Sequence, residues 1–374
     1  MNNNLRAYIA GAGTVTAIGG DSNMNYHSVK AGISGYQSAN YFTQSDEHIS
    51  MALVPEKALP PLLNEFNVRG ELSFRVRRIL RMCHVAAEEA MAGFTGKTTI
   101  PLIFAAPTNE VSLSEQFPAR FIHYLAEQTG LPIDPRISRL IGTGRSGVLD
   151  ALALALRYLY EGDFESILIG GGDSYQHTEL LAALDKEARI LAPGVMNGFA
   201  PGEGASFVLL TRDPSGALRT ETHLLSLRPP GVANEPGHLF SNEPYRGDGL
   251  AQAFKQALAT SAGEVKICDI YSSMNGEQYW AKEYGVARMR HQDYFEEAAT
   301  LHHPADCYGD LGAATGAALI NLAVQAQLNG QPAKPSLIYC SSDHRCRAAV
   351  RFEPISVASV QALQSTPLTR HVSS

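Results

Sequence analysis

Apolar segments that read as strands alternate with helical segments along most of the chain, and this alternation restricts the fold more than any other feature. Residues 99–106, 164–169 and 205–210 are short runs rich in Ile, Leu, Phe and Val, while residues 149–160 form a longer apolar helix. Strands that lack polar alternation are buried on both faces. The pattern therefore predicts an α/β fold whose sheet is covered by helices on both sides.

The second part of the chain repeats the pattern of the first. A turn at 213–216 separates the two parts. After it we expect helices at 250–260 and 312–328, and strands at 265–273, 336–340 and 348–352. We therefore predict two similar halves, residues 1–215 and 216–360, followed by a polar tail at 361–374.

Composition narrows the class of protein. The 374 residues are 45% hydrophobic and carry a net charge of -7, which suits a large core and argues against nucleic acid or an anionic membrane as partner. The sequence has neither an apolar run of about 18–20 residues nor a secretory signal pattern, so we expect a cytoplasmic protein. The five cysteines are irregularly spaced, with no CxxC pair. We therefore predict no disulfide framework, no metal site and no cofactor.

Two other motifs admit a functional and a structural interpretation. Gly11 and Gly13 follow the first strand, but Thr16 replaces the third glycine of a dinucleotide motif, so we predict a tight loop there. The helix at 74–83 carries Arg75, Arg77, Arg78 and Arg81. We interpret these arginines as a solvated face, with an acidic partner as the alternative.

Five glycine-containing motifs follow one another in a fixed order. They lie at residues 10–19, 29–35, 161–174, 197–205 and 308–314. In this order they resemble the β-ketoacyl synthase family of the thiolase-like superfamily. The resemblance implies a thiolase-like fold with two pseudo-duplicated halves and five layers, α-β-α-β-α. Glu203, between two glycines of the fourth motif, is expected to be a buried scaffold carboxylate held by backbone amides.

The same resemblance implies where catalytic residues should stand. The family uses a cysteine at a helix N-terminus and two histidines, or a histidine and an asparagine. The cysteine position falls on Gly144, the first histidine on Met274 or Asn275, and the second on Gly309 or Asp310. Glycine cannot be acylated, methionine cannot transfer a proton and asparagine cannot act as a base. The active site is therefore predicted to be degenerate.

Three nearby residues, Ser146, His344 and Cys346, could in principle replace the lost chemistry. Ser146 follows Gly144, and we interpret its hydroxyl as a helix cap rather than a nucleophile. His344 and Cys346 lie where the family has a glycine-rich loop, and a packed structural role is favoured there. His302 is expected to lie in a loop upstream of the second histidine position.

These observations favour a catalytically inactive ketosynthase-like protein that acts as a binding, assembly or accessory subunit. The family resemblance implies a homodimer, or a heterodimer with a ketosynthase-like chain, and leaves an acyl carrier protein or a secreted bacterial effector as further partners. The alternative is an active acyltransferase or 3-oxoacyl synthase that uses relocated residues. A sensor that binds acyl groups or carrier proteins without reacting, through the arginine-bearing helix, is a third hypothesis.

Overall fold

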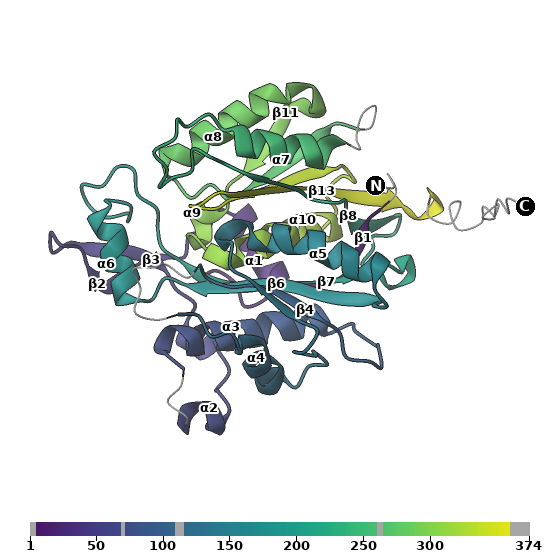
Figure 1. Ribbon diagram of the computed structural model, residues 1–374, viewed down its shortest axis with the longest axis horizontal. Coiled ribbons are helices and arrows are strands. Elements are labelled where there is room, and N and C mark those ends of the chain that lie inside the picture. The colour runs from purple at the N-terminus through teal and green to yellow at the C-terminus, as the bar shows by residue number, and fades with distance from the viewer. Residues whose placement is uncertain (1–4, 69–71, 109–115, 260–264, 360–374) are drawn as a thin grey trace, which may run out of the picture.

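The protein is described by a computed structural model that covers residues 5–68, 72–108, 116–259 and 265–359. Five layers follow one another in Figure 1: two sheets alternate with three layers of helices. The middle layer contains α1 (Ser22–Lys30), α5 (Gly147–Glu161) and α10 (Thr315–Leu328). The lower outer layer contains α3 (Phe74–Met91) and α4 (Phe121–Thr129). The upper outer layer contains α7 (Asp248–Leu258) and α8 (Gln278–Arg290). The predicted five-layered α/β fold is confirmed.

The strand order demonstrates an internal repeat. In the first half the order is β1 (Ala7–Thr16), β7 (Glu203–Thr211), β6 (Ser166–Ser174), β4 (Leu102–Ala105) and β5 (Arg139–Ile141). In the second it is β8 (His223–Leu227), β13 (Cys346–Ser356), β12 (Ser336–Ser341), β10 (Ile267–Ser272) and β11 (Phe295–His302). In each half the first two steps are antiparallel and the last two parallel.

The two halves meet along a short seam, because β1 pairs with β8 only at Ala7 and Tyr8. β9 (Gly231–Asn234) adds a second partner to β13. The exact boundary at 215/216 stays a prediction. The predicted polar tail at 361–374 lies outside the described residues.

Shorter strands, helices and 3-10 turns complete the fold. They are β2 (Tyr36–Phe42), β3 (His48–Ala52), α2 (Asn64–Val68), α6 (Thr178–Lys186) and α9 (Ala305–Tyr308), with 3-10 turns η1 (Glu56–Ala58), η2 (Gly144–Ser146), η3 (Pro214–Gly216), η5 (Gln292–Tyr294) and η6 (Gly312–Ala314). Within the described residues, no helix is long and apolar enough to cross a membrane.

The middle helix α10 shows how the layers are held together. Its residues are buried almost all round, as expected for a helix between two sheets. The buried Asn321 side chain donates to the carbonyl oxygens of Gly13 (2.9 Å) and Phe207 (3.1 Å), and thus ties the helix to β1 and β7. Buried polar side chains need such partners, so Asn321 fixes where α10 lies on the sheet.

The glycines of the first motif lie in a strand, so the predicted loop is wrong. β1 continues through Gly11 and Gly13 to Thr16. A Cβ atom on Gly13 would lie 2.0 Å from the carbonyl oxygen of Ala86, and one on Gly11 would lie 2.0 Å from that of Ala90. Glycine is required here because the backbone of α3 packs directly on the strand.

Candidate functional site

The turn at Gly144 begins the candidate site. It connects β5 to α5, and Gly144 has φ +67°, a left-handed conformation that favours glycine. A Cβ atom built there would lie 3.3 Å from Cγ2 of Thr108 and 3.4 Å from Oγ of Ser342. Side chains from two other segments therefore close around the position where the resemblance places a nucleophile.

The neighbouring Arg145 turns inward and occupies the centre of the site. Its side chain is only 4% exposed. The guanidinium donates to Asp310 (Nη1 to Oδ2, 2.6 Å), to the Ser341 carbonyl (3.0 Å) and to Asp343. It also lies over the Trp280 ring, 4.8 Å from the ring centroid. A charged group thus fills space beside the former nucleophile position.

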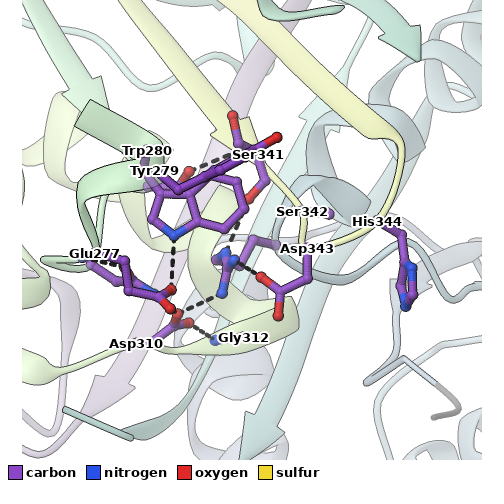
Figure 2. Close-up of polar contacts among 12 residues, drawn as sticks. Glu277, Tyr279, Trp280, Asp310, Gly312, Ser341, Ser342, Asp343 and His344 are labelled. Carbon is purple, nitrogen blue, oxygen red and sulfur yellow. Dashed lines mark hydrogen bonds and ion pairs between the residues drawn. The ribbon is translucent and has the colours of Figure 1, made fainter. Parts of the chain in front are cut away.

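Arg145 is one member of a closed cycle, which we call the charge ring: Arg145, Asp310, Asn275, Glu277, Arg189 and Asp343. The Asn275 amide donates to Asp310 (2.8 Å) and to Glu277 (3.1 Å). Arg189 then donates to both Glu277 oxygens (2.7 and 3.0 Å) and to Asp343 (2.9 Å). Figure 2 shows Glu277 and Asp310 on one side of the site and Asp343 on the other, below the Trp280 ring.

The charges of the ring stabilise one another. Burial alone would lower the pKa of Arg145, but the carboxylates of Asp310 and Asp343 raise it well above its ordinary value. Burial would likewise raise the pKa of Asp343, yet Arg145 and Arg189 hold it at about 2. Arg145 and Asp343 are therefore ionised at neutral pH, and the arrangement of the ring is that of a buried structural ion network.

Of the two alternatives for the second histidine position, Gly309 and Asp310, only Asp310 contributes a side chain to the charge ring. Asp310 belongs to the ring, whereas Gly309 has φ +74° and shapes the backbone before it. Asp310 is fixed by its amide, which donates to the Ala200 carbonyl (2.9 Å), and by its carbonyl, which accepts from Gly202 (3.0 Å). The approach is so close that a Cβ atom on Gly202 would lie 2.9 Å from the Asp310 carbonyl oxygen.

In the loop that follows β10, Asn275 contributes to the ring and Met274 does not. The Asn275 side chain is 5% exposed, while Met274 is half-buried and donates its backbone amide to Ser272 (3.0 Å). Asn275 also accepts from the backbone amide of Glu277 (3.2 Å). Asn275 and Asp310 are thus brought together: Asp310 accepts from Arg145, and Asn275 donates to Asp310.

A second buried arginine, Arg347, secures the loop that covers the site. It is fully buried, pairs with Glu283 (2.6 Å) and donates to the carbonyls of Ser342 and His344 (2.6 Å each). Its guanidinium lies 5.6 Å from the centroid of the Trp280 ring. Where the family has a flexible glycine-rich loop, this chain has a loop that is fixed by side chains.

Sequence reasoning missed much of this network. It did not identify Arg189, Glu277, Trp280, Glu283 or Arg347. The available signal was weak: Trp280 is the only tryptophan in the chain, and Glu277 precedes it by three residues at a helix start. The indole nitrogen of Trp280 donates to the Glu277 carboxylate (2.9 Å).

The candidate substitutes Ser146, His344 and Cys346 do not form a catalytic group together. The Ser146 hydroxyl is fully buried and shares a hydrogen bond with Ser342 Oγ (2.7 Å). It makes no capping bond to α5, so the predicted cap is wrong, because Ser342 and the Thr143 carbonyl (3.2 Å) engage the hydroxyl instead. Burial raises the pKa of the Cys346 thiol, which disfavours the reactive thiolate.

His344 lies apart from the charge ring in Figure 2. Its imidazole packs against Phe240 and His238, with ring centroids 5.2 and 5.8 Å apart. Among the described residues, the Ser146 hydroxyl bonds with the Ser342 hydroxyl and with the carbonyls of Thr143 and Cys346, and no histidine is among its partners. The geometry of a nucleophile and its base is therefore not present at these three residues.

Two small cavities border the charge ring, and the larger one, of about 90 Å³, lies beside Arg189 and Asp343. The cavity that borders Asn275, Gly309 and Asp310 has a volume of about 10 Å³, which is room for about one water molecule. The hydroxyl groups of Tyr308 and Thr315 line it and have no protein partner among the described residues. No acyl chain fits in this space without rearrangement.

The arginines of α3 are engaged within the protein, so their interpretation as a solvated face is wrong. Arg78 is 6% exposed and donates to Glu203 (2.7 Å), and Arg75 donates to Asp173 (2.8 Å). Arg77 and Arg81 donate to backbone carbonyls at 2.7 and 2.6 Å. Glu203 is fully buried as expected, but Arg78 and Ser174 hold it in addition to the one backbone amide of Val54.

The remaining question about polar groups is whether they could bind a metal ion or form disulfides. Among the described residues, no group of three or more His, Cys, Asp and Glu side chains could hold a metal ion. All five cysteines are present as free thiols.

The sequence matches no protein-family model and no curated protein. Solved structures, in contrast, match over nearly the whole chain. A chain of the ketosynthase in complex with its chain length factor from Xenorhabdus doucetiae has a TM-score of 0.71 at 16% identity, covering 95% of this chain and 99% of that chain. The ishigamide ketosynthase/chain length factor has a TM-score of 0.70 at 17% identity, with coverage of 93% and 98%.

A third match is a chain of a complex described as a type II acyl-carrier protein with its ketosynthase bound to the hexaketide. It has a TM-score of 0.69 at 15% identity, covering 94% of this chain and 99% of that chain. At these identities the likeness establishes the fold. The five layers, the repeated strand order and these matches agree. The chain has the thiolase-like fold of the ketosynthases.

Proposed function

We propose that this chain is a catalytically inactive ketosynthase-like protein that serves as a binding, assembly or accessory subunit. The observation that carries the proposal is the charge ring. Arg145, between Asp310 and Asp343, occupies the place beside Gly144 where an acyl group would react. A buried ion network is a poor environment for an apolar acyl chain, because its charges lose stabilisation when their partners move.

The packing around the ring supports the same proposal. The Trp280 ring contacts the guanidinium groups of both Arg145 and Arg347, and the two cavities that border the charge ring have volumes of only about 10 and 90 Å³. Catalysis would require open space for substrate and a base within hydrogen-bond reach of the nucleophile. The interior instead resembles a core that stabilises a surface used for binding.

The partner that we favour is a ketosynthase-like chain, in a heterodimer or as a second copy. Two of the similar structures are complexes that pair a ketosynthase with a chain length factor, and a third contains an acyl carrier protein. A secreted bacterial effector is the second partner class, and no contact in the fold favours it. The arginines of α3 give an acidic carrier protein little free charge to bind, because their groups are paired internally.

Covalent labelling tests the absence of catalysis. The full chain is incubated with a long-chain acyl thioester and its intact mass is measured, beside an active ketosynthase as positive control. We expect no mass increase on this chain under conditions that acylate the control fully. Stoichiometric acylation that is lost in Ser146→Ala or Cys346→Ala would overturn the proposal and establish the alternative, an acyltransferase with relocated residues.

Co-expression tests the partner. The chain is co-expressed with a ketosynthase or an effector from the neighbouring genes, and each purified complex is analysed by light scattering. We expect either a homodimer near twice the chain mass of 40.3 kDa or a one-to-one complex with the synthase. A protein that stays monomeric and binds only the effector would contradict the ketosynthase-partner assignment.

A further inference from the structure

An irregular segment, residues 235–246, connects β9 to α7 and covers one edge of the charge ring; we call it the lid. The amide of Leu239 donates to the carbonyl of Asp343 (3.2 Å). The ring centroid of Phe240 lies 5.8 Å from Cζ of Arg189, and these two residues line the cavity of about 90 Å³ together with Asp343. Because Phe240 is 44% exposed while Arg189 is buried, the lid lies between the charge ring and solvent.

Few hydrogen bonds attach the lid to the rest of the protein. The Glu235 amide donates to the Arg345 carbonyl (2.7 Å), and its carboxylate accepts from an amide in the first turn of α7 (2.7 Å). The Tyr279 hydroxyl donates to the Gly237 carbonyl (2.6 Å). Residues 240–244 form no hydrogen bond with another segment of the described chain. Segments with so few attachments open locally at a low cost in free energy.

A pair of histidines holds the middle of the lid against the loop at 342–345. The rings of His238 in the lid and His344 in the loop have centroids 5.8 Å apart, and the Phe240 ring adds a contact with His344 at 5.2 Å. Nδ1 of His238 is buried and has no hydrogen-bond partner among the described residues. A protonated Nδ1 is a donor that needs an acceptor, so this environment favours the neutral imidazole.

Most of the charged groups around His238 are cationic. His344 and Arg345 belong to the facing loop, and Arg347 is the second residue of β13. Burial has the largest effect on the pKa of His238 and lowers it; these three groups lower it further, and Glu235 raises it. Arg347 is fully buried and paired, so it cannot move away from a positive charge on the imidazole.

The carboxylates of Glu235, Glu283 and Asp343 adjoin the lid, and each already has partners. Glu235 accepts from two backbone amides (3.2 and 2.7 Å), and Glu283 pairs with Arg347 (2.6 Å). Asp343 is held by the two arginines of the charge ring. Glu187 lines the same cavity as Phe240, but its side chain is 47% exposed, so water screens its charge. No carboxylate is therefore placed to compensate an imidazolium in the lid.

We infer that the lid is a pH-sensitive switch, closed while His238 is neutral and opened when its imidazole is protonated. Opening removes Phe240 from the cavity wall and exposes Arg189 and Asp343, one edge of the charge ring, to solvent and to a partner. The closed lid binds the proton less tightly than the open lid. Closure is therefore favoured above the ordinary histidine pKa of about 6.5 and is lost as the pH falls through the closed-lid value. The inference does not depend on whether the charge ring is catalytically inactive.

Hydrogen exchange of the full chain measures the state of the lid. Peptides that cover residues 235–246 are followed by mass spectrometry at about pH 7.5 and about pH 5.5, and the rates are corrected for the intrinsic pH dependence of amide exchange. We expect the protection of the lid to fall at least about fivefold at the lower pH, while peptides of α10 keep theirs. Equal corrected protection of the lid at both pH values would overturn the inference, and so would a parallel loss in α10, which indicates unfolding of the whole protein.

Variants assign the proton to His238. His238→Phe keeps an aromatic ring against His344 but cannot be protonated, so its lid should exchange equally at both pH values. Arg345→Gln removes an exposed cation that disfavours protonation of His238, so the pH response should become smaller. The matched control is His123→Phe, at an exposed histidine of α4, which should respond like the native protein. A lid that still opens at low pH in His238→Phe, or an undiminished response in Arg345→Gln, would contradict the assignment.

Discussion

Replacing Arg145 with methionine should destabilise the fold by about 3–5 kcal/mol, the range for removing one partner of a buried ion pair. The substitution keeps most of the side-chain length, but it leaves the buried Asp310 without a cation and Asp343 with Arg189 alone. It also removes the hydrogen bond to the Ser341 carbonyl (3.0 Å) and the contact with Trp280. Because Arg145 is 4% exposed, water cannot easily replace these interactions.

The single tryptophan makes the assay direct. Trp280 is 2% exposed and lies in contact with Arg145, so its fluorescence reports unfolding in urea and the local environment at once. The matched control is Arg157→Met in α5, where the pair with Glu161 is exposed (70% and 71%). That change should cost no more than about 0.5 kcal/mol.

A double variant separates charge from packing. Adding Asp310→Asn to Arg145→Met removes one uncompensated carboxylate. The double variant should therefore lose less free energy of unfolding than the two single variants lose in sum. If Arg145→Met lowered the free energy of unfolding by less than about 1 kcal/mol, the reasoning would be refuted, since the ring would then contribute no more to stability than a surface ion pair. Additive single and double variants would refute the direct coupling of Arg145 and Asp310.

Three further perturbations test other parts of the structure. Gly144→Ala should cost roughly 1–3 kcal/mol in urea unfolding, because φ is +67°; an unchanged midpoint would mean that the turn relaxes freely. Gly13→Ala should prevent soluble expression or lower the thermal midpoint strongly, because its Cβ would meet the α3 backbone at 2.0 Å, whereas Gly20→Ala, with no atom within 4 Å, should behave like the native protein. Burial, together with His344 and nearby arginines, lowers the pKa of His238. The stability from a neutral His238 is therefore present above the unfolded pKa of about 6.5 and is lost as the pH falls through the folded value. The urea midpoint should fall between pH 7.5 and 5, and less so in His238→Leu; equal pH profiles of the two proteins would contradict this.

The periodic patterns of the sequence predicted the fold class. Buried strands and helices at regular spacing indicated an α/β protein of two similar halves, and the resemblance carried by the five glycine motifs implied the five layers. Local patterns failed where packing outweighed them. β1 runs through Gly11 and Gly13 because α3 packs against its backbone, and His302 belongs to a strand because β10 pairs with it. Both facts depend on contacts with distant segments.

From the sequence alone we predicted what is missing: Gly144 bears no nucleophile, and the positions that the resemblance assigns to the two histidines hold Met274 or Asn275 and Gly309 or Asp310. It could not determine what those residues do. Arg145 meets Asp310 from 165 positions away, and Asp343 from 198. Local periodicity does not show which distant carboxylates an arginine beside a turn will meet. Only the tertiary structure, which buries both ends of each pair together, converts the emptied site into the charge ring.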